Sequence, residues 1–374
     1  MKDGYCQLGE FIRPVDIRNT DGKETNLLGV SVQKKFIPSI ANTVGTDFTK
    51  YKVVKKHQFT YIPDTSRRGD KIGIALLEDY ESGIVSNIYT VFDVVDTEKL
   101  LPEYLMLWFM RPEFDRYARY KSHGSVREIF DWEQMCKVEL PVPDIEKQRK
   151  IVKAYKTITD RIALKQRIND NLEATAQAYF DKLFIDGFEC TTNLDKIASI
   201  NPTRNLAKNQ IARCFDMSTL PLKGCIPVGG EYKPYNGGMR FINGDTILAR
   251  ITPCLENGKA AYINILDENE VAFGSTEYIV LSPKENVPSS FFYFLARNSI
   301  FISYAVAHMN GSSGRQRVSG SDIANYPIKE PSKDELQMFD KYASKVLYEM
   351  KVSALEIEKL KELQENITAT ISGC

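Results

Sequence analysis

The sequence is short of several features that would point directly to a chemistry. It has three histidines, two tryptophans and no excess charge, since 49 Lys and Arg balance 49 Asp and Glu in 374 residues. Its seven cysteines are scattered, without a Cys-x-x-Cys spacing. A zinc site or a disulfide framework is therefore not expected. We expect the cysteines to be reduced thiols in a cytoplasmic protein.

Targeting and membrane signals are also missing. Residues 1–4 begin no apolar stretch, so no signal peptide is expected. The longest hydrophobic run, residues 291–307, is interrupted by Arg297 and Asn298 and is too short to span a bilayer. No membrane association is predicted.

The common catalytic motifs are absent. We find no Gly-x-x-x-x-Gly-Lys, Gly-x-Gly-x-x-Gly, His-Glu-x-x-His or Gly-x-Ser-x-Gly pattern. The sequence Asn201-Pro202-Thr203-Arg204 lacks the second proline and the aromatic residue with which amino-methyltransferases hold a flipped base. Asp144, Glu146 and Lys147 have the composition of a nuclease set, but they lie at a predicted helix start, where capping explains the aspartate. Neither catalysis by this chain nor a cofactor is expected.

What the chain does contain is a repeat of its own pattern, displaced by about 187 positions. Pro143 and Pro331 each open a roughly 40-residue helical pattern. The strand-like stretch 57–62 pairs with 243–248, and 86–91 pairs with 275–280. Because the order of these pairs is kept throughout, the sequence predicts a duplicated domain.

Both long segments are predicted helices with a narrow apolar stripe. Apolar residues recur at spacings of three and four, which requires a second helix to bury the stripe. Asp144 and Ser332 are placed as N-caps, and Ser332 with Glu335 forms a capping box. An antiparallel pair of helices, each roughly 60 Å long, satisfies both stripes within one chain. Self-association of the protein through these helices is the alternative.

These patterns predict an α+β protein with two similar mixed α/β domains, two long antiparallel helices and an internal pseudo-two-fold repeat. The expected divisions are a first domain at 1–143, a central helix at 144–186, a second domain at 187–331 and a C-terminal helix at 332–374.

Basic and small polar residues recur around the predicted strands of both halves. The Gly/Ser-rich segment 311–317 corresponds to the shorter segment 124–127 in the first half. Such loops let backbone amides approach phosphates, and Arg and Gln can read guanine and adenine edges. A solvated loop without a ligand is the alternative. The candidate DNA-binding residues are Lys55, Lys56, Arg67, Arg68, Lys71, Ser125, Arg127, Arg204, Arg250, Lys259, Ser312, Ser313, Arg315, Gln316 and Arg317.

On these residues the chain resembles the specificity subunit of type I restriction-modification systems. That family's half-repeat carries a Gly-Asp-hydrophobic-Leu strand, a Gly-Ser-Gly-Gln-Lys/Arg loop and a Pro-led helix start. Residues 244–248 and 311–318 match the first two elements, and Asn201-Pro202 stands where the family opens a recognition domain. In the first half Gln58-Phe59 replaces the Gly-Asp pair.

The resemblance implies a non-catalytic subunit that reads a bipartite, asymmetric site on double-stranded DNA, with the helices as a spacer. It implies a methyltransferase subunit as partner, in two copies if the repeat presents equivalent faces, and an ATP-dependent restriction subunit if the system is complete. Cations on the first helix and acids on the second are candidate docking residues. The balanced net charge suggests that a partner supplies part of the positive potential. The alternatives are a self-sufficient DNA methyltransferase or nuclease, and a structural scaffold built on the helix pair.

Overall fold

The computed structural model describes residues 4–39, 45–65, 71–123, 128–187, 189–312 and 314–371. The chain folds into two compact units, Met1–Arg161 with Leu360–Cys374 (unit 1) and Ile162–Lys359 (unit 2). The division crosses both long helices, α4 (Ile145–Phe184) and α8 (Lys333–Thr370), so each unit contains a part of each helix.

Unit 1 is built on an antiparallel sheet of order β2-β9-β6-β7. The rings of Phe59 and Phe92 on this sheet stack with their centroids 4.8 Å apart, and the ring of Phe109 lies edge-on to Phe59 at 5.7 Å between centroids. Because Phe109 belongs to helix α1, this helix covers one face of the sheet. The strands of unit 1 are β1 (Tyr5–Gln7), β2 (Ile12–Val15), β3 (Leu28–Val30), β4 (Phe36–Pro38), β5 (Lys52–Lys55), β6 (Phe59–Tyr61), β7 (Ile74–Leu76), β8 (Ser82–Val85), β9 (Thr90–Val94) and β10 (Glu139–Pro141). The short helices are η1 (Leu8–Glu10), η2 (Phe48–Lys50), α1 (Pro102–Phe109), α2 (Pro112–Lys121) and α3 (Trp132–Cys136).

Unit 2 has the corresponding antiparallel sheet, of order β12-β19-β16-β17. Its strands are β11 (Thr192–Asn193), β12 (Ala198–Ile200), β13 (Ile211–Phe215), β14 (Glu231–Pro234), β15 (Met239–Phe241), β16 (Thr246–Ala249), β17 (Ala260–Tyr262), β18 (Ala272–Gly274), β19 (Tyr278–Pro283) and β20 (Pro327–Ile328). Its short helices are η3 (Leu194–Lys196), α5 (Ser289–Arg297), α6 (Ser299–Ala307) and α7 (Gly320–Ala324).

The two units repeat one topology element by element. The pair β1–β10 corresponds to β11–β20, and α1, α2 and α3 correspond to α5, α6 and α7. The second sheet of unit 2, of order β14-β13-β18-β15, includes a parallel pairing of β13 with β18. Unit 1 has the same parallel step in the bridge between Leu27 and Ile84. The predicted fold class is confirmed, including the duplication.

The start of each long helix follows the predicted capping chemistry. Asp144 accepts a hydrogen bond from the backbone N–H of Lys147 at 2.9 Å. Ser332 Oγ accepts from the Glu335 N–H at 3.3 Å, while Glu335 Oε2 accepts from the Ser332 N–H at 2.9 Å. These bonds satisfy amide groups that a helix start leaves without partners.

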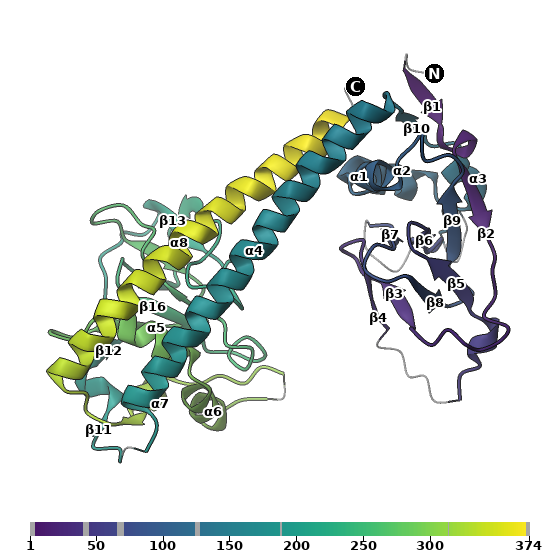
Figure 1. Ribbon diagram of the computed structural model, residues 1–374. Coiled ribbons are helices and arrows are strands. Elements are labelled where there is room, and N and C mark those ends of the chain that lie inside the picture. The colour runs from purple at the N-terminus through teal and green to yellow at the C-terminus, as the bar shows by residue number, and fades with distance from the viewer. Residues whose placement is uncertain are drawn as a thin grey trace. The chain divides into compact units, whose positions relative to one another are not determined.

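The two long helices pack antiparallel (Figure 1). In unit 2 Lys165 pairs with Glu356 at 2.6 Å, and further along α4 the ring of Tyr179 lies 6.0 Å from that of Tyr342, which is earlier on α8. Within unit 1 Gln364 donates to Thr159 Oγ1 at 2.7 Å. The predicted antiparallel arrangement is therefore present.

Aromatic side chains fix the helices to the core of unit 2. Phe339 of α8 packs against Phe180 at 5.5 Å and Phe184 at 5.6 Å, both from α4, and against Phe294 of α5 at 5.5 Å. In unit 1 a polar side chain contributes as well: the buried Gln148 donates to the Lys99 and Pro143 carbonyls and accepts from the Leu101 N–H.

The hydrophobic run 291–307 is interrupted by a turn between α5 and α6, where the Asn298 side chain accepts from the N–H groups of Ile300 and Phe301. Within the described part of the chain, no helix has an apolar stretch able to cross a bilayer. Six cysteines lie in the described ranges, and all six are free thiols.

Candidate nucleic-acid interface

Three connections of unit 2 meet at one end of its main sheet. They are residues 250–259 between β16 and β17, residues 275–277 before β19, and the loop 310–317. The Arg250 N–H donates to the Glu277 carbonyl at 2.9 Å, and the Arg250 carbonyl accepts from the Val318 N–H at 3.0 Å. We call this group of connections the strand-end rim of unit 2.

The loop 310–317 closes as a small hairpin. Asn310 and Arg317 exchange backbone hydrogen bonds at 2.9 Å in both directions. Thr252 and Gln316 join the loop to the β16–β17 connection through the Thr252 N–H, which donates to the Gln316 carbonyl at 3.1 Å, and the Gln316 N–H, which donates to Thr252 Oγ1 at 3.2 Å. Gly311 has a φ of 129°, where a Cβ would come within 3.0 Å of the Arg315 oxygen. The glycine therefore permits the turn.

Arg317 is held inside the rim by a carboxylate. Its Nε lies 2.9 Å from both carboxylate oxygens of Glu277, and its Nη2 lies 2.7 Å from Oε1. The hydrogen bond from Arg317 lowers the pKa of Glu277, against the opposing effect of burial. Because Nη1 of Arg317 also donates to the Arg315 carbonyl at 3.0 Å, this side chain fixes the shape of the loop.

The tip of the same loop is exposed. The Arg315 N–H donates to the Ser312 carbonyl at 2.9 Å, which forms the turn, and both residues face solvent. Gln316 is half-buried at the base of the turn. Ser313 lies outside the described residues.

Two further candidates, Arg250 and Lys259, border the loop on the β16–β17 connection. The Nε atom of Arg250 is buried and has no hydrogen-bond acceptor within the described chain. Lys259 Nζ donates to the Met217 carbonyl at 3.0 Å, and its own carbonyl accepts from the Ala249 N–H. The structure thus brings Arg250, Lys259 and the loop residues together.

Arg204 is not part of this rim. Its Nη2 donates to both oxygens of Asp245, at 2.8 and 2.9 Å, and to Ser282 Oγ at 3.0 Å. Asp245 precedes β16 and is 1% exposed, whereas the rim follows the other end of that strand. Burial raises the pKa of Asp245, and a backbone hydrogen bond and Arg204 act in the opposite direction. Arg204 therefore neutralises a buried carboxylate.

Unit 1 has an equivalent rim with the same backbone pairing. His123 and Ile129 form a bridge, as do Asp64 and Ile129, in the positions that Asn310–Arg317 and Ile251–Arg317 occupy in unit 2. Lys71 is exposed just before β7 at this end of the sheet. The candidates Arg67, Arg68, Ser125 and Arg127 fall outside the described residues.

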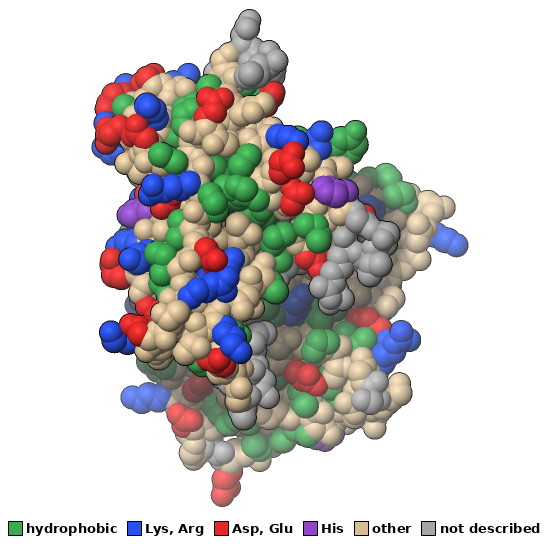
Figure 2. Space-filling model, turned by 90° about the vertical axis from the view of Figure 1, so that its right-hand side faces the viewer, with side chains coloured by type: hydrophobic (Ala, Val, Ile, Leu, Met, Phe, Trp, Pro, Cys, Tyr) green, Lys and Arg blue, Asp and Glu red, His purple; other side chains and the backbone are tan. Residues whose placement is uncertain are grey.

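Lys55 and Lys56 are separated from Lys71 by the length of a strand. Lys55 ends β5 and Lys56 lies in the connection from β5 to β6, whereas Lys71 follows the other end of β6. Lys55 is exposed on β5, and Lys56 pairs with Glu81 at 2.5 Å. On the face drawn in Figure 2, basic and acidic side chains are interspersed, in keeping with the zero net charge.

Comparison with known proteins identifies part of the chain. Residues 10–174 match the family model of the type I restriction modification DNA specificity domain. Over these residues the chain is similar to that domain. The resemblance found in the sequence is therefore confirmed.

Two relatives from Escherichia coli carry the same family description. The chain is 33% identical over 156 residues to the type I restriction enzyme EcoAI specificity subunit, covering 40% of this chain and 26% of that protein. It is 28% identical over 204 residues to the EcoEI specificity subunit, covering 50% of this chain and 33% of that protein. The chain thus aligns with about a quarter to a third of the length of these relatives.

A solved structure supports the fold over the whole chain. The S subunit of a type I restriction-modification system from M. genitalium superposes with a TM-score of 0.59, covering 98% of this chain and 95% of that one, at 11% identity. At this identity the likeness concerns the fold alone.

Sequence reasoning missed two residues that shape the strand-end rim of unit 2. Glu277, the partner of Arg317, lies 40 residues away in sequence, and Thr252 lies 64 residues from Gln316. The alignment of 86–91 with 275–280 placed Glu277 at the start of a strand. This is the one sequence signal that points to Glu277. Nothing local in the sequence pairs either residue with the loop.

Proposed function

We propose that this chain is a DNA-recognition subunit of a type I restriction-modification complex and carries no catalytic site of its own. The observation that carries the proposal is the duplicated strand-end rim: the backbone bridge of His123 with Ile129 in unit 1 repeats that of Asn310 with Arg317 in unit 2, while the residues between the bridged positions differ in sequence. A common scaffold with different loop residues suits two readers of different sequences.

The rim of unit 2 has the chemistry that groove readout requires. Arg315 is exposed at the tip of the loop. Arg and Gln side chains can each form two hydrogen bonds to the edge of one base, Arg to guanine and Gln to adenine. Arg317 holds the loop through Glu277, which reduces the conformational entropy lost on binding. Ser312, Arg250 and Lys259 are proposed to contact phosphates from the same rim.

The proposed target is a bipartite, asymmetric site on double-stranded DNA. Residues 1–143 and 187–331 would each read one half-site, and the helical segments 144–186 and 332–374 would set an unspecified spacer between them. In the first domain, Lys71 is the described candidate that lies at the rim end of the sheet. Lys55 and Lys56 would contact DNA only through a second surface.

The proposed partners supply the chemistry and part of the charge. The relatives' names describe specificity subunits of restriction enzymes, so we propose a methyltransferase subunit, in two copies, and an ATP-dependent restriction subunit where the system is complete. The long helices provide the proposed docking faces through charged side chains, of which Lys165 and Glu356 are half-buried and pair with each other. The cations are Arg149, Lys150, Lys153, Lys156, Arg161, Lys165 and Arg167, and the acids are Glu349, Glu356, Glu358, Glu362 and Glu365.

A domain exchange tests the proposal. Residues 190–330 would be replaced by the matching segment of another specificity subunit, and the methylated sequence would be mapped in cells that carry the partner methyltransferase. One half-site should change while the other half-site is kept. A methylated sequence unaltered in both halves would show that these residues do not read DNA.

A point variant tests the loop itself. Arg315→Ala should weaken binding to the cognate duplex by about 1–3 kcal/mol and relax the base preference at one position. Lys196→Ala is the matched control, because it removes an exposed cation of unit 2 from η3, which leads into β12 at the end of the sheet away from the rim. Equal affinities for the two variants in the assembled complex would argue against the loop as a reader.

A further inference from the structure

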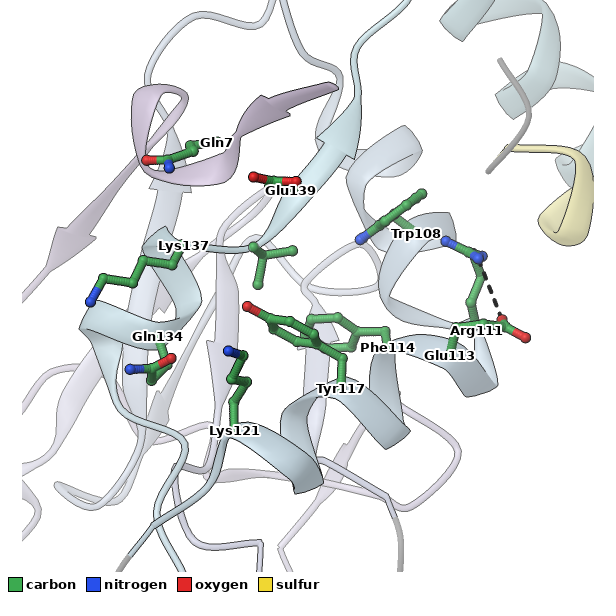
Figure 3. Close-up of a pocket in the computed structure, with 11 residues that line it drawn as sticks. Gln7, Trp108, Arg111, Glu113, Phe114, Tyr117, Lys121, Gln134, Lys137 and Glu139 are labelled. Carbon is green, nitrogen blue, oxygen red and sulfur yellow. Dashed lines mark ion pairs between the residues drawn. The ribbon is translucent and has the colours of Figure 1, made fainter. Parts of the chain in front are cut away.

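Unit 1 has a cavity of about 670 Å³ that is distinct from the strand-end rim. It lies between α2, α3 and the strand pair β1–β10, with Trp108 of α1 at one side (Figure 3). Aromatic side chains (Trp108, Phe114, Tyr117) line it together with charged ones (Arg111, Lys121, Glu139). A cavity of this size and mixed lining is typical of a small-ligand site.

Arg111 is the unusual member of this lining. The residue is 6% exposed, and its Nε has no hydrogen-bond acceptor within the described chain. Its guanidinium lies 4.1 Å from the centroid of the Trp108 ring, which covers one face of the group. The nearest carboxylate, Glu113, is 3.5 Å from Nη2 and is shared with Arg116 at 3.1 Å. A buried guanidinium with so little compensation favours an added anionic acceptor.

The second half of the chain shows that the cavity is not required by the fold. At the equivalent place in unit 2, Tyr326 packs against Phe301 at 4.9 Å and Tyr304 at 5.0 Å. Phe301 and Tyr304 correspond to Phe114 and Tyr117 through the α2–α6 repeat, but the smaller Val138 stands in the place of Tyr326. Unit 1 therefore leaves open a space that unit 2 fills with its own side chain.

The arginine differs between the halves as well. Asn298 is the counterpart of Arg111, and it donates to Asp181 of α4 at 2.8 Å, so it needs no ligand. Across the cavity from Arg111, Lys121 is exposed at the end of α2, with its Nζ 5.9 Å from the Tyr117 ring. Unit 1 thus combines an open aromatic space with two cations that the repeat does not require.

We propose that this cavity binds a carboxylate carried on an aromatic or aliphatic stem, either from a partner polypeptide or as a free acid. The aromatic walls would take the stem and Arg111 would take the carboxylate, while Lys121 at the other end of the cavity adds positive potential. A carboxylate is favoured over a phosphate because Glu113 and Glu139 line the same cavity and repel a dianion more strongly. The lining includes none of the rim residues described for unit 1.

Tryptophan fluorescence can test the site directly. The chain has two tryptophans, Trp108 in the cavity and Trp132 in α3. In a Trp132→Phe background, Trp108 is the sole reporter. Titration with 3-phenylpropionate should change its emission saturably, and the neutral 3-phenylpropionamide should bind at least about tenfold more weakly. The dipeptide N-acetyl-Phe-Asp-amide tests whether the natural carboxylate comes from a polypeptide, with N-acetyl-Phe-Asn-amide as its uncharged control. Tighter binding of N-acetyl-Phe-Asp-amide than of 3-phenylpropionate indicates a polypeptide ligand.

Variants locate the binding. Val138→Tyr copies the residue of unit 2 and should abolish the signal, whereas Val138→Ile should keep it. Should Val138→Tyr fail to give a cooperative thermal transition, the exposed Lys121→Glu replaces it, with an expected loss of about tenfold or more. Lys99→Gln, a distant exposed change in the same unit, is the control.

The proposal is wrong if acid and amide bind equally, or if a folded Val138→Tyr protein still gives the saturable change. Displacement of 3-phenylpropionate by inorganic phosphate or by duplex DNA at lower concentration would likewise overturn it, in favour of a nucleic-acid contact.

Discussion

Several basic side chains of this protein are bound to internal carboxylates. Arg317 is held by Glu277, Arg204 by Asp245, and the buried Lys34 by Asp115 at 2.8 Å. Asp115 also accepts the Ile72 N–H at 3.1 Å, next to the exposed Lys71. Basic residues therefore divide into those bound to an internal carboxylate and those exposed to solvent, and only the exposed ones suit the proposed contact with DNA. Sequence alone does not separate the two groups.

The Arg204–Asp245 pair gives a test at the level of one residue. Arg204→Met would leave the 1% exposed Asp245 without its counter-charge, which should lower the free energy of unfolding by about 3–5 kcal/mol at pH 7. The loss should be measured by urea unfolding.

The same variant should show a characteristic pH dependence. Burial already raises the pKa of Asp245, and loss of Arg204 raises it further. The folded variant then binds more protons than the unfolded chain, so its stability falls as pH rises from the unfolded pKa to the folded one. The penalty should be smaller near pH 4 than at pH 7. A pH-independent penalty would mean that Asp245 is not the group responsible.

At the scale of elements, the helix starts show how local chemistry supports the long helices. Glu335 caps α8 and also binds Lys329 Nζ at 2.5 Å. The bond from Lys329 is the main cause that lowers the pKa of Glu335 to about 2.

Glu335→Ala should therefore destabilise unit 2 in a pH-dependent way. Since the folded pKa lies below the usual value of 4.5, the stabilisation is complete above that value and is lost as pH falls toward about 2. We expect a loss of about 1–2 kcal/mol at pH 7 that shrinks between pH 4.5 and 2. Thermal unfolding across this range measures it, with the exposed Glu349→Ala on the same helix as control. A difference that stays constant down to pH 2 would contradict the assignment.

The long helices and the repeat could be predicted because their signals are local or periodic. Apolar spacing and capping residues located α4 and α8, and the stretches 57–62 and 243–248 overlap β6 and β16. The parallel β13–β18 pairing could not be predicted, since it joins segments about 60 residues apart without a sequence signature. The same holds for Arg317 with Glu277. The candidates Lys55 and Lys71 are close in sequence, yet a strand places them at opposite ends of the sheet.

At the scale of the whole molecule, duplication followed by divergence explains both likeness and difference. The two units share their strand order, helix order and loop pairing. Equivalent positions nevertheless carry different residues with different roles, as in the pairs Val138 and Tyr326, and Arg111 and Asn298. One unit can therefore acquire a new base preference, or a new cavity, while the fold of the other is kept. This independence is what the proposed asymmetric two-part DNA site would require.

The proposed spacer role of the helices gives the last test. Four residues inserted into α4 after Lys165 would add about 6 Å to the helix, which corresponds to about one or two base pairs of duplex. If α4 sets the distance between half-sites, methylation mapping should show a longer spacer with both half-sites kept. Replacing four exposed residues of α4 by alanine, without a change in length, should leave the spacer as it was. An unchanged spacer in the insertion variant, with methylation intact, would mean that the distance is set by the partner subunits and not by this chain.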